Sequence, residues 1–320
     1  MSDRQIQADF WLNDYMTPWD MYAHGITRYL TSQKTNYQQM DIVETGLYGR
    51  ALVLDGKWQS CTGDEFLYHE PLVHPPLICH GNPRSVLILG GGEGATLREV
   101  LRWKTVEEAV MVDLDEAVVE ACRKHLPEMA AGVFEDPRVT VHIDNAINFL
   151  DTTSRQWDII ISDLSEPVEY GPSFPLFTRE YFQKMAKLLQ PDGCLVVQAG
   201  STSPVRLDFH AKIANTIAQI FPNIQSYSSS VPSFGEPWGF ILASAEPIPS
   251  RPDPKEVDRL LAEKTTGGFR MLDGSTLLGL FQIPIYLREA IAAETGIYTL
   301  SDPPKEVGQG ILKDSPTSNP

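Results

Sequence analysis

The chain has 320 residues, of which 42% are hydrophobic, and it carries 42 acidic against 26 basic side chains, giving a net charge of −16. This length and apolar content suffice for a large core, while the negative charge argues against a nucleic-acid or general phosphate-binding surface and favours a cationic small molecule. The four cysteines are scattered without a CxxC pair, no signal peptide is recognisable, and no apolar run reaches the ~20 residues of a membrane span, so we expect a cytoplasmic protein without membrane contact.

Short alternating runs between residues 38 and 62 predict a small antiparallel β domain. The run 38–44 is followed by Thr45-Gly46, and Asp55-Gly56 interrupts the run 50–60. Pairs of this kind form tight turns between antiparallel strands. We therefore predict that residues 1–75 form an N-terminal β-strand domain.

From residue 84 onward, strand-like and helix-like patterns alternate. Such alternation produces right-handed crossovers and a mainly parallel sheet covered on both faces, with ligands at the carboxyl ends of the strands. The sequence thus predicts an α/β, Rossmann-like catalytic domain over residues 76–301, helical after the proline-rich stretch 247–254, and a disordered tail over 302–320. The predicted strands are 86–89, 109–114, 139–143, 158–163 and 194–198, with helices such as 116–125 and 179–189 between them.

A glycine-rich loop, GGGEGA at residues 90–95, follows the first of these strands. Gly90, Gly92 and Ala95 have the G-x-G-x-x-G/A spacing, and Asp113 lies at the end of the next strand. An acid at that place binds the two ribose hydroxyls of a nucleoside in folds of this type. The pattern therefore favours a nucleoside ligand over a purely structural turn.

A carboxylate in the same loop narrows the choice of nucleoside. A pyrophosphate would meet the anionic side chain of Glu93 beside the helix N-terminus, which disfavours NAD. An S-adenosyl sulfonium is positively charged and has no phosphate, so it is compatible with Glu93. The alternative is that Glu93 faces solvent at the start of the helix, where acids are common.

A second acidic stretch, DLSEP at residues 163–167, follows the strand 158–162. Asp163 and Glu166 are three residues apart across a turn, so both can face one cavity, on the same rim of the sheet as Glu93 and Asp113. Several carboxylates on one rim suit an oligoamine. The alternative is that Asp163 only caps the segment that follows.

Together these motifs resemble those of the polyamine aminopropyltransferases, the spermidine and spermine synthases. The resemblance extends from about residue 10 to residue 300. It implies the S-adenosylmethionine-dependent methyltransferase type of Rossmann fold, a homodimer, and transfer of an aminopropyl group from decarboxylated S-adenosylmethionine to a polyamine, with release of methylthioadenosine. No prosthetic group is implied and no metal, in line with histidines that match no common metal motif. The matching stretches are Tyr37-Gln38, DEFLYHE (64–70), GGGEGA, VDLD (112–115) and DLSEP.

The resemblance also assigns roles to individual residues. A protonated acceptor amine has a pKa near 10 and must lose a proton before it can attack the carbon beside the sulfonium. By match to the motifs, Asp163 is the candidate base, Tyr68 helps to position the amine, and Glu166, where the family usually has Asp, binds another nitrogen of the acceptor. Glu93 is expected to bind the donor's ammonium and to repel the carboxylate of ordinary S-adenosylmethionine. The other residues expected at the donor are Gln38, His69, Gly90, Gly92, Asp113, Asp163 and either Asn145 or Asp144, while Phe234 and Trp238 are either apolar walls for the acceptor or core aromatics.

Several positions are more similar to thermospermine synthases than to other members. Members that use putrescine typically have Gln, Ser and Tyr where this chain has His69, Leu164 and Phe234. These differences favour spermidine as acceptor and thermospermine as product, with a putrescine-using spermidine synthase as the alternative; agmatine as acceptor and spermine as product stay open. A methyltransferase and a polyamine-binding regulator without activity are more distant alternatives. Other stretches on the thermospermine side are Pro167-Val168-Glu169, Gln198-Ala199-Gly200 and Val231–Phe234 before Trp238-Gly239.

Overall fold

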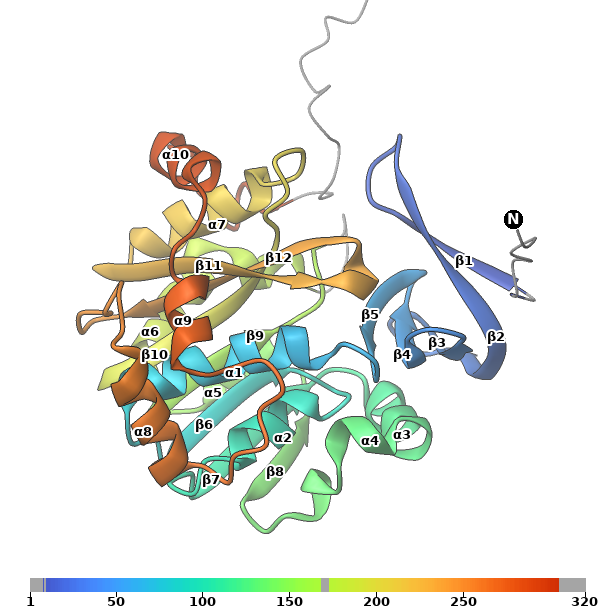
Figure 1. Ribbon diagram of the computed structural model, residues 1–320, viewed down its shortest axis with the longest axis horizontal. Coiled ribbons are helices and arrows are strands. Elements are labelled where there is room, and N and C mark those ends of the chain that lie inside the picture. Colours follow the sequence, from blue (N-terminus) through green and yellow to red (C-terminus); the bar gives the residue numbers. More distant parts are fainter. Residues whose placement is uncertain (1–7, 9, 168–172, 305–320) are drawn as a thin grey trace, which may run out of the picture.

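The computed structural model describes residue 8, residues 10–167 and residues 173–304, and the chain in these ranges forms two sheets (Figure 1). The smaller sheet has five antiparallel strands in chain order. Asp55 and Gly56 both have positive φ, 49° and 75°, as a type I′ hairpin turn requires. The strands are β1 (Phe10–Tyr15), β2 (Met21–Lys34), β3 (Gln39–Thr45), β4 (Gly49–Leu54) and β5 (Lys57–Cys61). The sequence predicted the last three, whereas the largely exposed β1 and β2 lack a clear alternating pattern.

The larger sheet has seven strands in the order β11-β12-β10-β9-β6-β7-β8. Five of them are parallel, and β12 runs antiparallel to both of its neighbours. The chain order reverses at β6, so a ligand crevice is expected at the carboxyl ends of β6, β7 and β9. These strands are β6 (Ser85–Gly90), β7 (Glu108–Asp113), β8 (Val139–Ile143), β9 (Trp157–Asp163), β10 (Leu189–Ser201), β11 (Asn223–Val231) and β12 (Glu236–Ser244). The predicted α/β fold is therefore confirmed.

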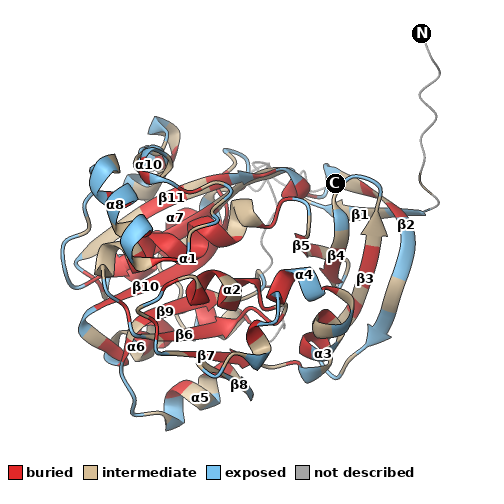
Figure 2. Ribbon diagram, turned by 60° about the horizontal axis from the view of Figure 1, so that its bottom comes forward, coloured by how far each residue is buried: buried red, intermediate tan, exposed pale blue. Residues whose placement is uncertain are grey.

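Helices cover both faces of the larger sheet, whose strands are largely buried (Figure 2). Within β6, Ile88 packs on one side with α1, α2, α8 and α9, whereas its neighbour Leu87 packs on the other with α5, α6 and α7, as the alternation of side chains along a strand dictates. The helices are α1 (Phe66–His80), α2 (Ala95–Leu101), α3 (Glu116–His125), α4 (Pro127–Ala130), α5 (Ala146–Thr152), α6 (Arg179–Lys187), α7 (Asp208–Ala218), α8 (Pro254–Lys264), α9 (Gly274–Leu280) and α10 (Ile285–Ala293).

Helix α1 contains three prolines, which are unfavourable inside a helix, so its sequence does not indicate a helix. A proline at position 75 has no N–H to donate to the carbonyl of Pro71, but the hydroxyl of Tyr227 donates to that carbonyl at 2.9 Å instead. The smaller sheet ends at Cys61, and α1 packs into the core of the larger sheet. The boundary predicted at residue 75 therefore falls inside a helix of the larger domain. Of the predicted tail, residues 305–320 lie outside the described residues, as do Val168 and Glu169.

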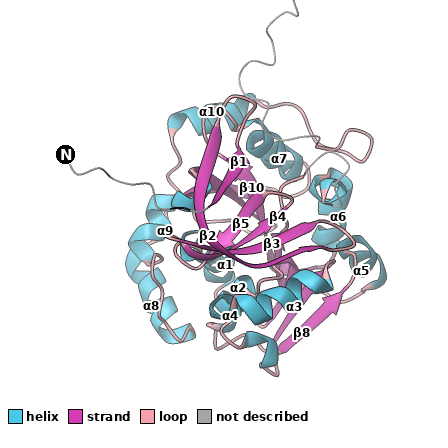
Figure 3. Cartoon of the chain, turned by 90° about the vertical axis from the view of Figure 1, so that its right-hand side faces the viewer, coloured by secondary structure: helices cyan, strands magenta, loops and turns pink. Residues whose placement is uncertain are grey.

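The N-terminal sheet lies against the carboxyl-end side of the larger domain, and Figure 3 looks onto it from the front. Met40 and Ile42 of β3 pack with Val118 and Cys122 of α3 in one buried cluster. A second cluster joins the same sheet to Phe234, which follows β11. The two sheets therefore enclose the crevice between them. Within the described residues, no helix combines the length and apolar character that crossing a membrane needs.

Candidate active site

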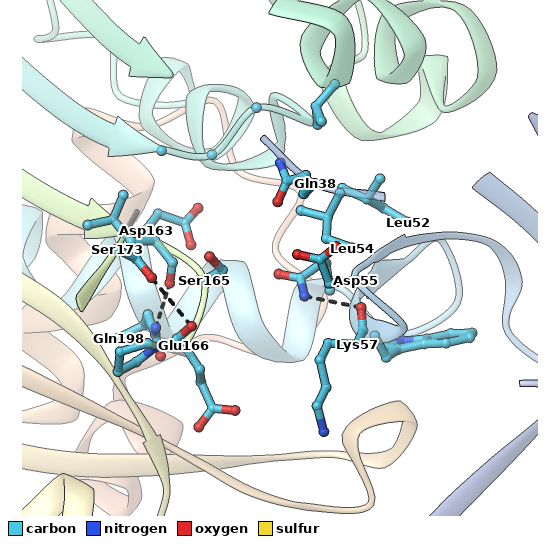
Figure 4. Close-up of a pocket in the computed structure, with 18 of the residues that line it drawn as sticks. Gln38, Leu52, Leu54, Asp55, Lys57, Asp163, Ser165, Glu166, Ser173 and Gln198 are labelled. Carbon is cyan, nitrogen blue, oxygen red and sulfur yellow. Dashed lines mark hydrogen bonds between the residues drawn. The ribbon is translucent and has the colours of Figure 1, made fainter. Parts of the chain in front are cut away.

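A cavity of about 810 Å³ lies where the carboxyl ends of β6, β7 and β9 meet the N-terminal sheet. Figure 4 shows Asp163, Ser165 and Glu166 on one wall and residues of the N-terminal sheet, such as Lys57, on the other. The predicted residues that line it are Gln38, Tyr68, Gly90, Gly92, Glu93, Asp113, Asn145, Asp163, Glu166, Phe234 and Trp238. The structure thus brings together side chains that are up to 200 residues apart in the sequence.

The glycine loop allows the strand ends to approach closely. Gly90 has φ of +85°, and a Cβ atom there would lie 2.1 Å from the carbonyl oxygen of Asp163. A Cβ on Gly92 would lie 2.8 Å from Oδ2 of Asp113. A side chain at position 90 would therefore collide with the backbone of Asp163, and one at position 92 would displace the carboxylate of Asp113.

Asp163 is held by hydroxyl groups on both oxygens. The hydroxyl of Tyr68 donates to Oδ1 at 2.7 Å, and that of Thr96 donates to Oδ2 at 2.6 Å. Burial, followed by the negative charge of Glu93, raises the pKa of Asp163 above its ordinary value. A fixed carboxylate with a raised pKa is suited to accept a proton from a group in the cavity.

Glu93 lies in the cavity wall, with His69 behind it. Nε2 of His69 is 3.1 Å from Oε1 of Glu93, and the His69 side chain is fully buried. His69 therefore does not line the cavity; it contacts Glu93, which does. Burial alone would raise the pKa of Glu93, but the hydrogen bond and charge of His69 outweigh burial and hold that pKa below its ordinary value.

Asp113 lies at the end of β7 and accepts a hydrogen bond from the backbone N–H of Asp115 at 2.9 Å. Burial raises the pKa of Asp113 to about 6, and the charges of Glu93, Asp115 and Asp163 act in the same direction. The amide nitrogen of Gln38 donates to Asp115 at 3.1 Å, so the N-terminal sheet is tied to this end of the cavity. Asp115 belongs to the VDLD stretch, but its place in that stretch does not indicate this contact with Gln38.

Asn145 and Asp144 differ in their access to the cavity. Asn145 lines it, while its side-chain oxygen accepts from the backbone N–H of Ile147 at 2.8 Å and caps α5. Asp144 does not line the cavity, and its Oδ1 accepts from the backbone N–H of Asn145 at 2.7 Å. Of the two, Asn145 is placed to contact a ligand.

The opposite end of the cavity holds charges that the sequence motifs did not reveal. Nη2 of Arg206 lies 3.9 Å from Oε2 of Glu166, and the same guanidinium pairs with Glu236. On the N-terminal sheet, Nζ of Lys57 donates to Oδ1 of Asp14 at 2.7 Å. Burial raises the pKa of Glu166 to about 7, opposed by the charge of Arg206. Because Asp14, Lys57 and Arg206 come from segments without any motif, only the fold places them here.

Aromatic and aliphatic side chains form the wall between these two ends. Phe234 and Trp238 pack edge to face, with ring centroids 4.9 Å apart, and both line the cavity together with Leu164. The indole N–H of Trp238 donates to Oε1 of Gln198 at 3.1 Å, and the amide nitrogen of Gln198 donates to the carbonyl of Leu164 at 2.5 Å. These bonds fix the apolar wall next to Asp163.

Comparisons with known proteins agree over nearly the whole chain. Residues 65–251 match the family described as spermine/spermidine synthase domain, and residues 11–61 match the spermidine synthase tetramerisation domain. A polyamine aminopropyltransferase of Synechococcus sp. (strain JA-3-3Ab) is 55% identical over 92% of this chain and 97% of its own length. One from Aeropyrum pernix is 42% identical over 91% of this chain and 94% of its own.

Solved structures show the same similarity. A spermidine synthase in complex with the transition state analogue AdoDATO has a TM-score of 0.81 and 28% identity over 92% of this chain and 99% of its own. The spermidine synthase from Thermotoga maritima gives the same TM-score and identity, over 92% of this chain and 98% of its own.

Proposed function

This chain belongs to the spermine/spermidine synthase family and is a polyamine aminopropyltransferase, and from that premise we propose that its acceptor is spermidine and its product thermospermine. The observation that supports this choice is the line of carboxylates beyond the base. Past Asp163, the cavity is lined by Glu166 and Asp14, which lie beside the cations Arg206 and Lys57, with the apolar wall of Leu164, Phe234 and Trp238 between the ends. Spermidine keeps two positive nitrogens besides the one that attacks, whereas putrescine keeps one.

In our proposal the donor, decarboxylated S-adenosylmethionine, occupies the end of the cavity near the glycine loop. Asp113 accepts hydrogen bonds from the two ribose hydroxyls, and Asn145 lies beside the adenine. Glu93 binds the ammonium of the aminopropyl chain. Gly90 and Gly92 bring the loop close to the nucleoside without obstructing it. The donor is a substrate that is consumed, because its aminopropyl group leaves with the acceptor.

The proposed reaction is a single in-line displacement. The acceptor nitrogen first gives a proton to Asp163, and Tyr68, whose hydrogen points to Asp163, accepts an N–H of the same amine through an oxygen lone pair. The nitrogen lone pair then forms the new C–N bond while the C–S bond breaks and its electron pair stays on sulfur. The sulfonium becomes the neutral sulfur of methylthioadenosine. The raised pKa of Asp163 helps it to take the proton.

A product assay tests the acceptor. With decarboxylated S-adenosylmethionine and, separately, spermidine, putrescine or agmatine, we expect methylthioadenosine release to be fastest with spermidine, and a separation that resolves spermine from thermospermine to find thermospermine. The double substitution Leu164→Ser with Phe234→Tyr adds hydroxyls to the apolar wall and should shift the ratio of kcat/KM values toward putrescine by about tenfold. Turnover of putrescine alone by the unchanged enzyme contradicts the proposal and makes the protein a spermidine synthase, as the two structural neighbours are named.

The pKa of Asp113 gives a pH prediction for donor binding. Methylthioadenosine has the ribose but not the ammonium, so its binding isolates Asp113 from Glu93. Because a pKa of about 6 means that Asp113 becomes protonated as the pH falls through this value, affinity should be constant above it. Below it, affinity should decrease by about tenfold per pH unit. Calorimetry between pH 5 and 8 measures the affinity for methylthioadenosine. The variant Asp113→Asn should bind methylthioadenosine weakly, with an affinity that does not depend on pH in this range. Constant affinity of the unchanged protein over this range would contradict the assignment.

The N-terminal sheet is our proposed oligomer contact. Phe10, Trp11, Tyr15 and Met21 of β1 and β2 are each at least half exposed, which is unusual for a monomer surface. The match of residues 11–61 to a tetramerisation domain supports an oligomer, and it points to an assembly larger than the homodimer expected from the sequence. Sedimentation velocity of the purified protein measures its size.

A further inference from the structure

His69 lies in the first turn of α1 with a carboxylate on each side of its ring. Nδ1 is 2.9 Å from Oε2 of Glu65 and also 2.9 Å from the backbone carbonyl oxygen of Glu65. Nε2 is 3.1 Å from Oε1 of Glu93. The His69 side chain is fully buried, and the side chains of Glu65 and Glu93 are 7% and 13% exposed. Water is therefore largely excluded from this row of three groups.

The hydrogen count of this row ties the charge on the ring of His69 to the protonation state of Glu93. An ionised carboxylate only accepts hydrogen bonds, so a ring nitrogen that faces one must carry a hydrogen. Glu65 also receives a hydrogen bond from Nη2 of Arg98 at 2.7 Å, which holds it in the ionised form. If Glu93 is ionised too, both nitrogens of His69 donate and the ring is a cation. The one other arrangement is a neutral ring beside a protonated Glu93.

A second buried histidine on the same helix shows the contrast. His74 is also fully buried, and its Nε2 lies 3.0 Å from Oε2 of Glu99. Its Nδ1, however, accepts a hydrogen bond from the indole N–H of Trp103 at 3.2 Å, so that nitrogen carries no hydrogen. His74 is therefore a neutral ring with one N–H. His74 provides an internal reference for the state of His69.

We propose that His69 is an imidazolium in the resting enzyme and acts as a positioning residue, which keeps Glu93 ionised and turned into the cavity before the donor arrives. This inference rests on the proposed role of Glu93 as the site of the donor's ammonium. Glu93 faces two other acids across the cavity, Asp113 and Asp163, whose charges oppose its ionisation. With His69 protonated, the charges along the row Arg98–Glu65–His69–Glu93 alternate in sign. The positive charge of His69 next to Glu93 offsets the negative charges of Asp113 and Asp163.

The pKa shifts run in the direction that this geometry requires. Burial alone would lower the pKa of His69, but the hydrogen bonds to Glu65 and Glu93 outweigh it and raise that pKa to about 10. The pKa of Glu65 is lowered, because the bonds from His69 and Arg98 outweigh the opposing effect of burial. The ring of Tyr68, 5.0 Å from that of His69, is uncharged while its hydroxyl is protonated.

Nitrogen NMR of the full-length, ligand-free protein tests the charge directly. With ¹⁵N-labelled imidazole rings at about pH 8.5, well above the pKa of an unperturbed histidine, we expect His69 to show two protonated nitrogens and His74 one. The variants H69Q and H74Q assign the two sets of signals. A neutral His69 at this pH overturns the proposal. If H69Q does not fold, E93Q gives an independent readout: removing the Glu93 charge should lower the pKa of His69, and an unchanged titration overturns the proposal.

Kinetics of H69Q test the positioning role. Gln brings no positive charge, so Glu93 should become protonated at a higher pH than in the unchanged enzyme. We expect the KM for decarboxylated S-adenosylmethionine to rise about tenfold near neutral pH and to recover as the pH increases, with kcat changed less than about threefold. H74Q, which removes the neutral histidine, should keep the donor KM within about twofold. A donor KM in H69Q with the same pH dependence as the unchanged enzyme overturns the proposal.

The two readouts separate this inference from the proposed function. The NMR measurement needs no substrate, so it decides the charge on His69 even if spermidine is not the acceptor. The donor KM can be measured with whichever polyamine the product assay identifies. If His69 is a cation and the enzyme uses putrescine, the inference about His69 is supported and the proposal that spermidine is the acceptor is refuted.

Discussion

Replacing Asp163 by Asn will lower kcat by about 10²- to 10⁴-fold, because the amide cannot take the proton of the acceptor amine. Asn keeps the size of the side chain, and its oxygen can still accept one of the hydrogen bonds from Tyr68 and Thr96. Release of methylthioadenosine in a single turnover, with a saturating acceptor, measures the chemical step without interference from product release.

The pH dependence of this variant distinguishes a lost base from lost geometry. Without Asp163, only the fraction of acceptor that is already unprotonated can react, so the rate of Asp163→Asn should rise about tenfold per pH unit up to the pKa of the amine near 10. Thr96→Val is the matched control, since it removes a hydrogen bond to the same carboxylate but leaves the base, and it should lose about tenfold or less. A single-turnover rate of Asp163→Asn equal to that of the unchanged enzyme would refute the assignment.

Replacing Glu93 by Gln should have the second largest effect, on the donor alone. A hydrogen-bonded charge pair with the donor's ammonium is worth about 1.5–3 kcal/mol, so we expect the affinity for decarboxylated S-adenosylmethionine to fall by about 10- to 150-fold. Ordinary S-adenosylmethionine has a carboxylate beside that ammonium, and we expect Glu93 to repel it. Its affinity should therefore change little or improve, and the preference between the two donors should shrink.

Calorimetry with both donors measures this preference. Glu166→Gln is the matched control, because it removes a carboxylate from the other end of the same cavity. Its donor affinity should stay within about twofold while the KM for the acceptor rises. If Glu93→Gln binds both donors as the unchanged protein does, Glu93 has no part in choosing between them.

The sequence was most informative where a residue lies next to a strand end. Glu93, Asp113 and Asp163 follow buried strands, and parallel strands end on one rim, so their convergence could be predicted before the structure. Asp14 and Arg206 could not be found in this way. Asp14 lies in an exposed strand of the smaller sheet, Arg206 lies in the loop after β10, and only the packing of the two sheets brings them into one cavity.

His69 shows a different limit of sequence reasoning. Its place in the family motif predicted a residue at the donor, but a motif does not say whether a side chain lies in the cavity or behind a neighbour. That depends on where Glu65 and Arg98 meet across α1 and α2, which is a tertiary contact. Helix α1 is a further example, because its three prolines are unfavourable inside a helix and the hydroxyl of Tyr227, distant in sequence, supplies a hydrogen bond that they lack.

The two sheets that enclose the cavity contribute different groups of residues to it. The acids proposed to hold the donor and to take the proton lie at the end of β7, at the end of β9 and in the loop after β6, whereas Asp14 and Lys57, at the far end, lie on the smaller sheet. Substitutions of Asp14 and Lys57 can therefore change the far end of the cavity while leaving in place the strands that carry Asp113 and Asp163.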